Sequence, residues 1–205
     1  ATDDDSVQWI SKSINKIMED NEPAQKIFGT LLFFEKFRSM EKYANFYDAK
    51  NSHNETMSFL LRIIKTATQL QSLRDASTAV ELKSAVDAIP HEFEFYTIEI
   101  RDFILQKQDL IIDAPSANAV VSFLRYFSEF NKCEFLRTAE FRDLIIDVLG
   151  PKISGGDSIE NFGRTIYNIT FENKPAADLY SNRKSLSAIL DCFHRATTAE
   201  SALWI

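Results

Sequence analysis

Apolar residues recur along the chain with the three-to-four-residue spacing of amphipathic helices. Two segments carry apolar residues at i, i+4 and i+7: Ile10, Ile14 and Ile17 near the start, and Phe162, Ile166 and Ile169 much later. Positions with this spacing fall on one face of an α-helix. The pattern therefore predicts two helices of about four turns, each with an apolar face available for packing.

Each of these helices is predicted to end at an asparagine. Asn21 is followed two positions later by Pro23, and Asn173 by Pro175. Asparagine can cap a new helix, and proline fits a first turn whose N–H groups lack partners, so the pair indicates a sharp change of direction. After each asparagine we expect a short helix and then a longer one, over 24–28 and 31–43 and again over 176–180 and 185–195.

Further patterns support this segmentation. In the last segment the apolar spacing falls on Leu186, Ile189, Leu190 and Phe193. Three residue pairs have the spacing of a capping box at a helix start: Ser52 with Glu55, Thr78 with Glu81, and Thr197 with Glu200. Residues 91–100 (HEFEFYTIEI) would also suit a strand. Because no partner strand is evident, we predict a helix there that continues to about residue 108.

The sequence repeats itself. Ser6 and the residues after it align without a gap with Ser158 onward, and residues 1–10 agree with residues 196–205 at five of ten positions. A weaker copy begins at Ser116, and another places Leu60 on Ile10. Ser201, the equivalent of Ser158 in the next copy, lies 43 residues after it. A fixed period of roughly 40 residues is the signature of a repeat solenoid. We predict about four units, of which the one between about residues 56 and 116 is longer than the others.

The segment Ile166-Tyr167-Asn168-Ile169-Thr170, with Asn173 downstream, resembles the third-helix signature of armadillo repeats. The resemblance implies an all-α superhelix of three-helix units that forms a single domain over 1–205. HEAT repeats, which pair two helices, are the nearest alternative. Trp9 and Trp204 occupy the same position in two copies and are expected to pack between units. Since neither end has a polar capping unit, we expect a piece of a longer array, or self-association through the open repeat ends.

The resemblance further implies a concave groove, lined by the third helices, that holds an extended peptide. The aligned positions that would face this groove are Lys12, Lys16, Arg62, Lys65, Arg125, Arg164 and Asn168. In nuclear-import receptors of this family the groove residues are tryptophan and asparagine, of which only Asn168 is kept. A basic groove is similar to that of beta-catenin, which takes acidic segments, and Lys and Arg favour carboxylate or phosphate groups. The alternative is a solvated helix face whose cations pair with nearby acids.

Composition narrows the classes of function. Five Gly and five Pro among 205 residues favour helices over many short strands, and a net charge of −7 opposes binding to nucleic acid. The longest apolar runs are far shorter than the ~18 residues of a membrane span. Two cysteines, Cys133 and Cys192, lie far apart and form neither a disulfide framework nor a zinc motif. We therefore expect a cytoplasmic protein without metal or cofactor.

No pattern of catalytic residues is evident. Of the three histidines only His194 lies near a cysteine, Cys192, and residues two apart on a helix point in different directions. The loop Gly155-Gly156-Asp157 is read as an ordinary turn, because Asp157 would repel a phosphate. The sequence thus predicts a scaffold that binds an acidic protein or peptide partner and is not an enzyme. The alternative is a structural, oligomer-building array without a peptide groove.

Overall fold

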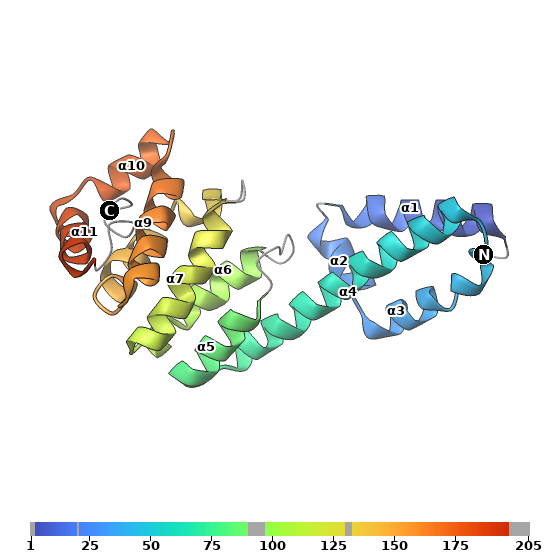
Figure 1. Cartoon of the computed structure of the whole chain (residues 1–205), viewed down its shortest axis with the longest axis horizontal. Helices are drawn as coiled ribbons and strands as arrows, with labels where there is room; N and C mark the ends of the chain where they lie inside the picture. The colour runs from blue at the N-terminus through green and yellow to red at the C-terminus, as the bar shows by residue number, and fades with distance from the viewer. Residues whose placement is uncertain (1–2, 20, 90–96, 130–132, 197–205) are drawn as a thin grey trace. The chain divides into compact units, whose positions relative to one another are not determined.

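The computed structural model describes residues 3–19, 21–89, 97–129 and 133–196, and every regular element in these ranges is a helix (Figure 1). The all-α prediction is therefore confirmed. The described residues form two compact units. Unit 1 comprises those up to Gln69 together with Thr97, and unit 2 comprises the rest from Leu70 onward. Each unit is considered by itself.

Unit 1 begins with three helices and a short 3-10 turn. These are α1 (Asp4–Met18), α2 (Glu22–Phe28), α3 (Leu31–Arg38) and η1 (Glu41–Tyr43). The long helix α4 (Tyr47–Asp75) follows, and its last residues belong to unit 2.

Unit 2 contains the remaining helices. In chain order they are α5 (Ala79–Ala88), α6 (Thr97–Gln106), η2 (Gln108–Leu110), α7 (Ala114–Glu129), η3 (Cys133–Leu136), α8 (Ala139–Asp143), the π-helical η4 (Leu144–Leu149), α9 (Gly156–Thr170), α10 (Lys174–Tyr180) and α11 (Arg183–Arg195).

The helices of the first and last triplets begin and end at equivalent residues, except at the end of the third helix. Gly156 lies 152 positions after Asp4 and Thr170 lies 152 positions after Met18, so α1 and α9 start and end at equivalent residues. The same displacement relates α2 to α10 at both ends and α3 to α11 at the start. The gapless alignment of the sequence therefore corresponds to a repeated arrangement of helices.

The two asparagines act as predicted. The side-chain oxygen of Asn21 accepts a hydrogen bond from the backbone N–H of Ala24 at 3.2 Å, and that of Asn173 accepts one from Ala176 at 2.9 Å. Proline stands in the first turn of both α2 and α10. Each asparagine thus satisfies an N–H that has no partner inside its helix, and starts the second helix of the triplet.

The predicted helix starts have mixed outcomes. Thr78 and Glu81 form a reciprocal capping box at the start of α5, as expected. The prediction for Ser52 is wrong, because α4 already begins at Tyr47 and both Ser52 and Glu55 lie inside it. The pair at residues 197 and 200 lies outside the described residues.

Helix α4 is longer than its aligned counterparts. In the alignment that places Leu60 on Ile10, the positions of Asn21 and Pro23 are taken by Gln71 and Leu73. Without the asparagine cap and the proline, the helix continues to Asp75. This continuation accounts for part of the predicted length of the second unit. Of the ambiguous segment 91–100, the part from Thr97 onward is the helix α6, which ends at Gln106, and the rest lies outside the described residues.

The buried faces differ in part from the predicted ones. Helix α1 buries Val7, Ser11, Ile14 and Met18. Ile10 and Ile17 are exposed, which corrects the prediction that they would line the packed face. Trp9 is also exposed, so its predicted packing between units is wrong, whereas Trp204 lies outside the described residues.

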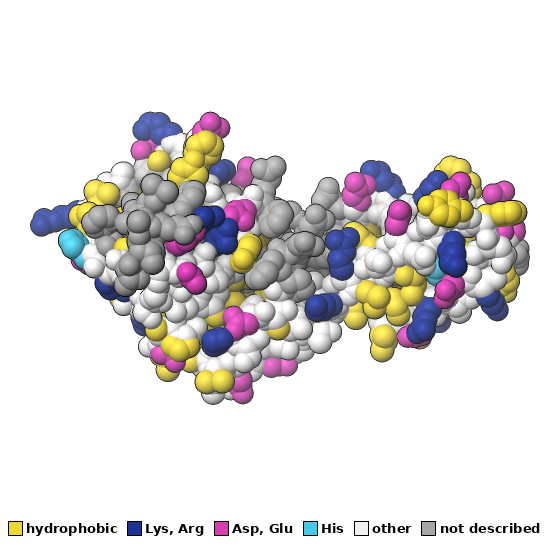
Figure 2. All heavy atoms as spheres, in the orientation of Figure 1, with side chains coloured by type: hydrophobic (Ala, Val, Ile, Leu, Met, Phe, Trp, Pro, Cys, Tyr) yellow, Lys and Arg dark blue, Asp and Glu magenta, His cyan; other side chains and the backbone are white. Residues whose placement is uncertain are grey.

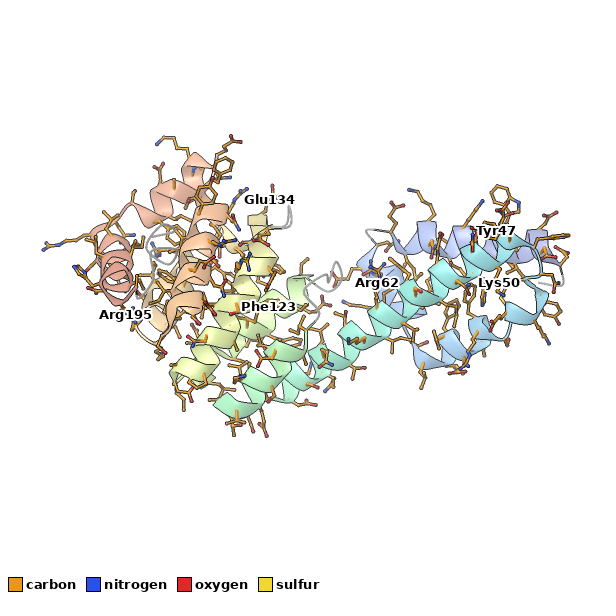
Figure 3. The ribbon with its side chains drawn as sticks, in the orientation of Figure 1. Tyr47, Lys50, Arg62, Phe123, Glu134 and Arg195 are labelled. Atoms are coloured by element: carbon orange, nitrogen blue, oxygen red, sulfur yellow. The ribbon has the colours of Figure 1, made fainter. Side chains whose placement is uncertain are left out.

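The buried residues of α11 also differ from those predicted from the apolar spacing. Leu186 and Leu190 are exposed, and the helix buries Ser185 and Cys192 instead. Arg195, labelled in Figure 3, donates from Nη2 to the carbonyl of Gly150 at 2.6 Å and from Nη1 to that of Ile153 at 2.8 Å. These bonds fix the end of α11 to the turn after η4.

Helices α7 and α9 lie side by side and run in the same direction (Figure 1). Asn118 at the start of α7 donates to the carbonyl of Ser154, at 3.0 Å. Further along, Asn161 donates to Ser122 Oγ at 3.1 Å and Asn168 donates to Ser128 Oγ at 3.0 Å. Both helices are copies of the same repeat position, so two neighbouring copies contact each other through equivalent helices within unit 2.

The turn before α9 requires glycine. Gly155, the N-cap residue, has φ of 88° and ψ of 148°, a region essentially restricted to glycine. A Cβ at this position would meet nothing within 4 Å, so the requirement comes from the backbone alone. The loop forms a tight turn between copies, as the sequence predicted.

Candidate functional site

The candidate site lies in unit 1, where α1 and α4 run side by side in the same direction. Near their starts, Asp4 Oδ1 accepts hydrogen bonds from the backbone N–H groups of Asn45 and Phe46, the second at 2.8 Å. Further along, Thr56 Oγ1 donates to the carbonyl of Ser11 at 3.2 Å. These buried and terminal bonds fix one helix against the other and leave a surface along their seam.

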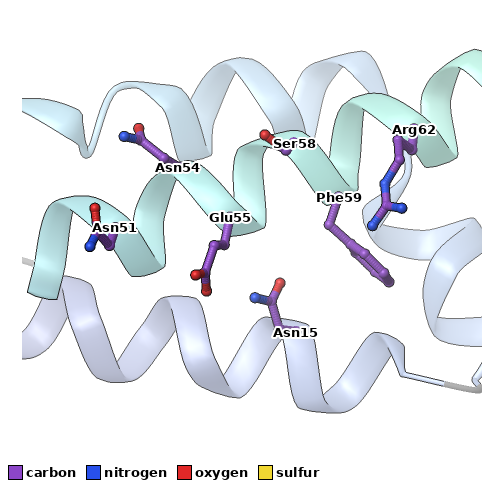
Figure 4. A pocket seen from close by; sticks show the side chains of 7 residues that line it. All are labelled: Asn15, Asn51, Asn54, Glu55, Ser58, Phe59 and Arg62. Atoms are coloured by element: carbon purple, nitrogen blue, oxygen red, sulfur yellow. The ribbon is translucent and has the colours of Figure 1, made fainter.

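A hollow of ≈ 490 Å³ opens on this seam. Its lining, shown in Figure 4, consists of Asn15 from α1 and Asn51, Asn54, Glu55, Ser58, Phe59 and Arg62 from α4. Three amides and a hydroxyl offer both donors and acceptors, Glu55 and Arg62 add one charge of each sign, and Phe59 supplies an apolar wall. The hollow is suited to a ligand that both donates and accepts hydrogen bonds.

A second hollow adjoins the first. It is lined by Lys12, Asn15, Lys16, Glu19 and Phe59, so Asn15 and Phe59 belong to both. We call the two together the α1/α4 surface. On α4 it extends from Asn51 to Arg62, about 16 Å along the helix at 1.5 Å per residue, which favours an elongated ligand.

Asn15 stands at the junction of the two hollows. In Figure 4 its amide lies between Glu55 and Phe59 and points toward α4. The carbonyl oxygen Oδ1 is buried, and no described residue donates a hydrogen bond to it. A buried polar atom without a partner costs free energy, about 1–3 kcal/mol. A ligand N–H that reached this oxygen would remove that cost.

The cations of the α1/α4 surface differ in their surroundings. Lys12 Nζ lies 5.2 Å from the ring centroid of Trp9, and the guanidinium of Arg62 lies 5.5 Å from that of Phe59. Among the described residues neither of them has an ion-pair partner within 4 Å. Lys16, in contrast, pairs with Glu19 at 2.5 Å. Lys65 is exposed further along α4.

The other predicted groove residues lie in unit 2 and are engaged there. Arg125 pairs with Glu129 at 3.1 Å, and Arg164 pairs with Glu160 at 2.6 Å, in both cases one turn away on the same helix. Asn168 donates to Ser128. The ion pairs of Arg125 and Arg164 match the alternative given in the sequence analysis, in which cations on a helix face pair with nearby acids. Lys12, Lys16, Arg62 and Lys65 thus lie in unit 1, and Arg125, Arg164 and Asn168 in unit 2.

Sequence reasoning missed most of the hollow on α4. Because the predicted start of this helix at Ser52 was too late, Asn51 was not assigned to it, and Asn54 was not considered as a groove residue. The signal was present, since Asn51, Asn54, Ser58 and Arg62 follow one another at intervals of three and four residues. Polar residues with that spacing fall on one helix face.

The described histidines, His53 and His194, and the buried Cys192 have different surroundings. His53 on α4 is buried and stacks on Phe37, with ring centroids 4.7 Å apart, and burial lowers its pKa while Glu41 opposes the shift. Burial raises the pKa of the Cys192 thiol. Cys192 contacts Arg195, whereas His194 Nδ1 lies 2.8 Å from the carbonyl of Leu190, so the two side chains have different partners.

The residues that the structure describes contain neither a cluster of metal-ligating side chains nor a helix that could span a membrane. Within those ranges, no three His, Cys, Asp or Glu side chains come together as a metal site would require. No helix in the same ranges combines the length and apolar character needed to cross a bilayer.

No family model, no curated protein and no solved structure matches this chain.

Proposed function

We propose that this chain is an armadillo-like, cytoplasmic binding protein without a catalytic role, and that its α1/α4 surface holds an extended peptide segment rich in acidic residues. The observation that carries the proposal is the buried side-chain carbonyl of Asn15, which has no hydrogen-bond donor among the described residues. It lies where the two hollows meet, and the first hollow also contains the amides of Asn51 and Asn54. The matching helix triplets and the parallel contact of α7 with α9 support stacking of the repeats as a solenoid.

The spacing of the polar side chains suits an extended backbone. Asn54, Ser58 and Arg62 are four residues apart on α4, which corresponds to about 6 Å per step. An extended peptide advances about 6.6 Å for every two residues. Successive side chains can therefore meet every second peptide group, which offers both an N–H and a C=O.

The preference for acidic segments comes from Lys12 and Arg62. Each lies over an aromatic ring, and a carboxylate on the ligand would give each a full ion pair. Glu19 and Glu55 also border the surface, so we expect a peptide with spaced carboxylates to bind better than one with a continuous acidic run.

The test uses a short fluorescent peptide that alternates Glu with Ser, and the same peptide with Gln in place of Glu. Binding is followed by fluorescence anisotropy at several salt concentrations. We expect the Glu peptide to bind more tightly, and the double variant Lys12→Glu with Arg62→Glu to weaken its binding by about 10-fold or more. Asn15→Leu, which removes the amide at nearly constant volume, should weaken both peptides.

The matched control is Lys36→Glu with Lys50→Glu. It makes the same change of net charge at two exposed positions of unit 1 that line neither hollow; Lys50 is labelled in Figure 3. Equal losses for the two double variants would mean that only net charge matters and would contradict the proposal. Equal binding of the Glu and Gln peptides would contradict the acidic preference.

A further inference from the structure

The first hollow of the α1/α4 surface contains hydrogen-bond acceptors that no described residue uses. The Glu55 carboxylate forms neither an ion pair nor a hydrogen bond with any residue that the structure describes. Asn15 Oδ1 is buried and also lacks a donor among those residues. An ionised carboxylate and an amide oxygen can only accept hydrogen bonds. This part of the hollow is therefore complementary to a ligand group that has several N–H donors and a positive charge.

Phe59 adds an aromatic wall beside these acceptors. It lies one turn after Glu55 on α4, and Figure 4 shows Asn15 facing the two residues from α1. A guanidinium is attracted to the face of an aromatic ring and is more weakly hydrated than an ammonium. It also presents five N–H donors in one plane, so it can serve two acceptors that border a ring. The three side chains together suit an arginine.

We propose that the peptide held by the α1/α4 surface carries an arginine whose guanidinium pairs with Glu55, donates to Asn15 Oδ1 and stacks on Phe59. We call these three residues the arginine subsite. The inference rests on the proposed peptide binding and names the residue type of the ligand at one position of that surface. Glu55 then determines specificity, because a ligand with a carboxylate at this position would bring a like charge to it.

The cations of the surface leave this position open. Lys12 Nζ lies over the ring of Trp9, 5.2 Å from its centroid, and does not pair with Glu55. Arg62 lies 5.5 Å from the ring centroid of Phe59, but this ring also borders the second hollow, beside Asn15. Arg62 stands seven residues after Glu55, about 10.5 Å along α4. Like charges at about that distance are largely screened at 0.1 M salt, whereas an ion pair in contact is screened much less.

The same spacing indicates where the acidic residues of the ligand lie. Alternate residues of an extended peptide are about 6.6 Å apart and point to the same side. The distance of about 10.5 Å between Glu55 and Arg62 lies between two and four residues of such a chain. An acidic residue two or four positions from the arginine can therefore reach Arg62. The expected ligand is an arginine flanked by acidic residues at alternate positions.

The test compares short fluorescent peptides that differ only at the central residue. The parent is Glu-Ser-Glu-Ser-Arg-Ser-Glu-Ser-Glu, and the others carry citrulline, lysine or glutamate in place of arginine. Citrulline is neutral and has nearly the same shape as arginine. Binding to the full chain is measured by fluorescence anisotropy. We expect the citrulline peptide to bind about 10-fold more weakly than the parent, and the lysine peptide to lie between them because an ammonium is not planar.

The protein variant Glu55→Gln removes the charge at constant shape. It should bind the arginine and citrulline peptides equally, within about 2-fold. The matched control is Glu35→Gln, at an exposed glutamate of α3 that lines neither hollow, and it should keep the full difference between the two peptides. Glu55→Lys should reverse the order, so that the glutamate-centred peptide binds more tightly than the arginine-centred one. A purely structural role of Glu55 would not exchange these preferences.

Equal binding of the arginine and citrulline peptides to the unaltered chain would overturn the inference, as would a preference for arginine that survives in Glu55→Gln. If the alternating Glu peptide still bound more tightly than its Gln counterpart in that case, the arginine subsite alone would be wrong and the acid-binding surface would stand. Absence of binding by every peptide would overturn both proposals.

Discussion

Replacement of Asn173 by alanine tests the element that starts the second helix of each triplet. Asn173 Oδ1 accepts a hydrogen bond from the N–H of Ala176 at 2.9 Å, and Ala176 is buried. Alanine would leave that N–H without its acceptor in a place that water reaches poorly. The loss of an N-cap costs about 0.5–2 kcal/mol, and burial of the donor places this one in the upper half of that range, about 1–2 kcal/mol.

Asn21 provides the internal comparison. Its bond to Ala24 is longer, at 3.2 Å, and the asparagine is exposed, so Asn21→Ala should cost less, about 0.5–1 kcal/mol. The assay is urea unfolding followed by circular dichroism, supported by thermal melts, in which a chain of this size loses about 2–4 °C per kcal/mol. Asn173→Asp keeps the acceptor and adds a negative charge at the helix start, so it should stay within about 0.5 kcal/mol of the unaltered chain.

The order of the three variants in their free energy of unfolding shows whether the side-chain cap is the source of the stability. If Asn173→Asp were as destabilised as Asn173→Ala, the side-chain cap would not be the source of the effect. If Asn21→Ala were clearly more damaging than Asn173→Ala, the ranking by bond length and burial would be wrong.

Three further predictions concern single positions. Because burial lowers the pKa of His53, the unfolded chain takes up the proton more readily, so stability should be full above about pH 6.5 and fall as the pH drops below it; His53→Phe should flatten this dependence in urea unfolding at different pH values. Gly155→Ala should cost about 1–3 kcal/mol through its backbone conformation alone, whereas Gly156→Ala, inside the first turn of α9, should be close to neutral in the same assay. Thr78→Ala breaks the capping box with Glu81 and should lower stability by about 1 kcal/mol, with faster amide hydrogen exchange at the start of α5 as the direct readout.

The starts of α2 and α10 were predictable because their signals are local. Asparagine followed by proline fixes where α2 and α10 begin, and the gapless alignment transferred those bounds from one triplet to the other. The length of α4 could have been inferred from the same rule, since Gln71 stands where Asn21 ends the earlier helix. Signals of this kind act within one helical turn, so they can be recognised without knowing which helix packs against the segment.

Burial was harder to predict because it depends on a second helix. Ile17 and Ile169 have the same place in the same sequence pattern, yet only Ile169 is buried, because α7 lies against α9. The periodicity of a segment states that a face can be buried and does not state that a partner covers it. The sequence also did not separate Lys12, which lies over Trp9, from Arg164, which pairs with Glu160, although each of these contacts lies within a single helix.

The contact between α7 and α9 has a defined register because directional bonds hold it. The amides of Asn118, Asn161 and Asn168 each meet one oxygen along the seam. Sliding one helix past the other by a turn, about 5.4 Å, would break all three bonds together, whereas a purely apolar seam could repack at the new offset. The seam therefore has one preferred alignment, because a partly shifted arrangement of the two helices would keep none of the three hydrogen bonds.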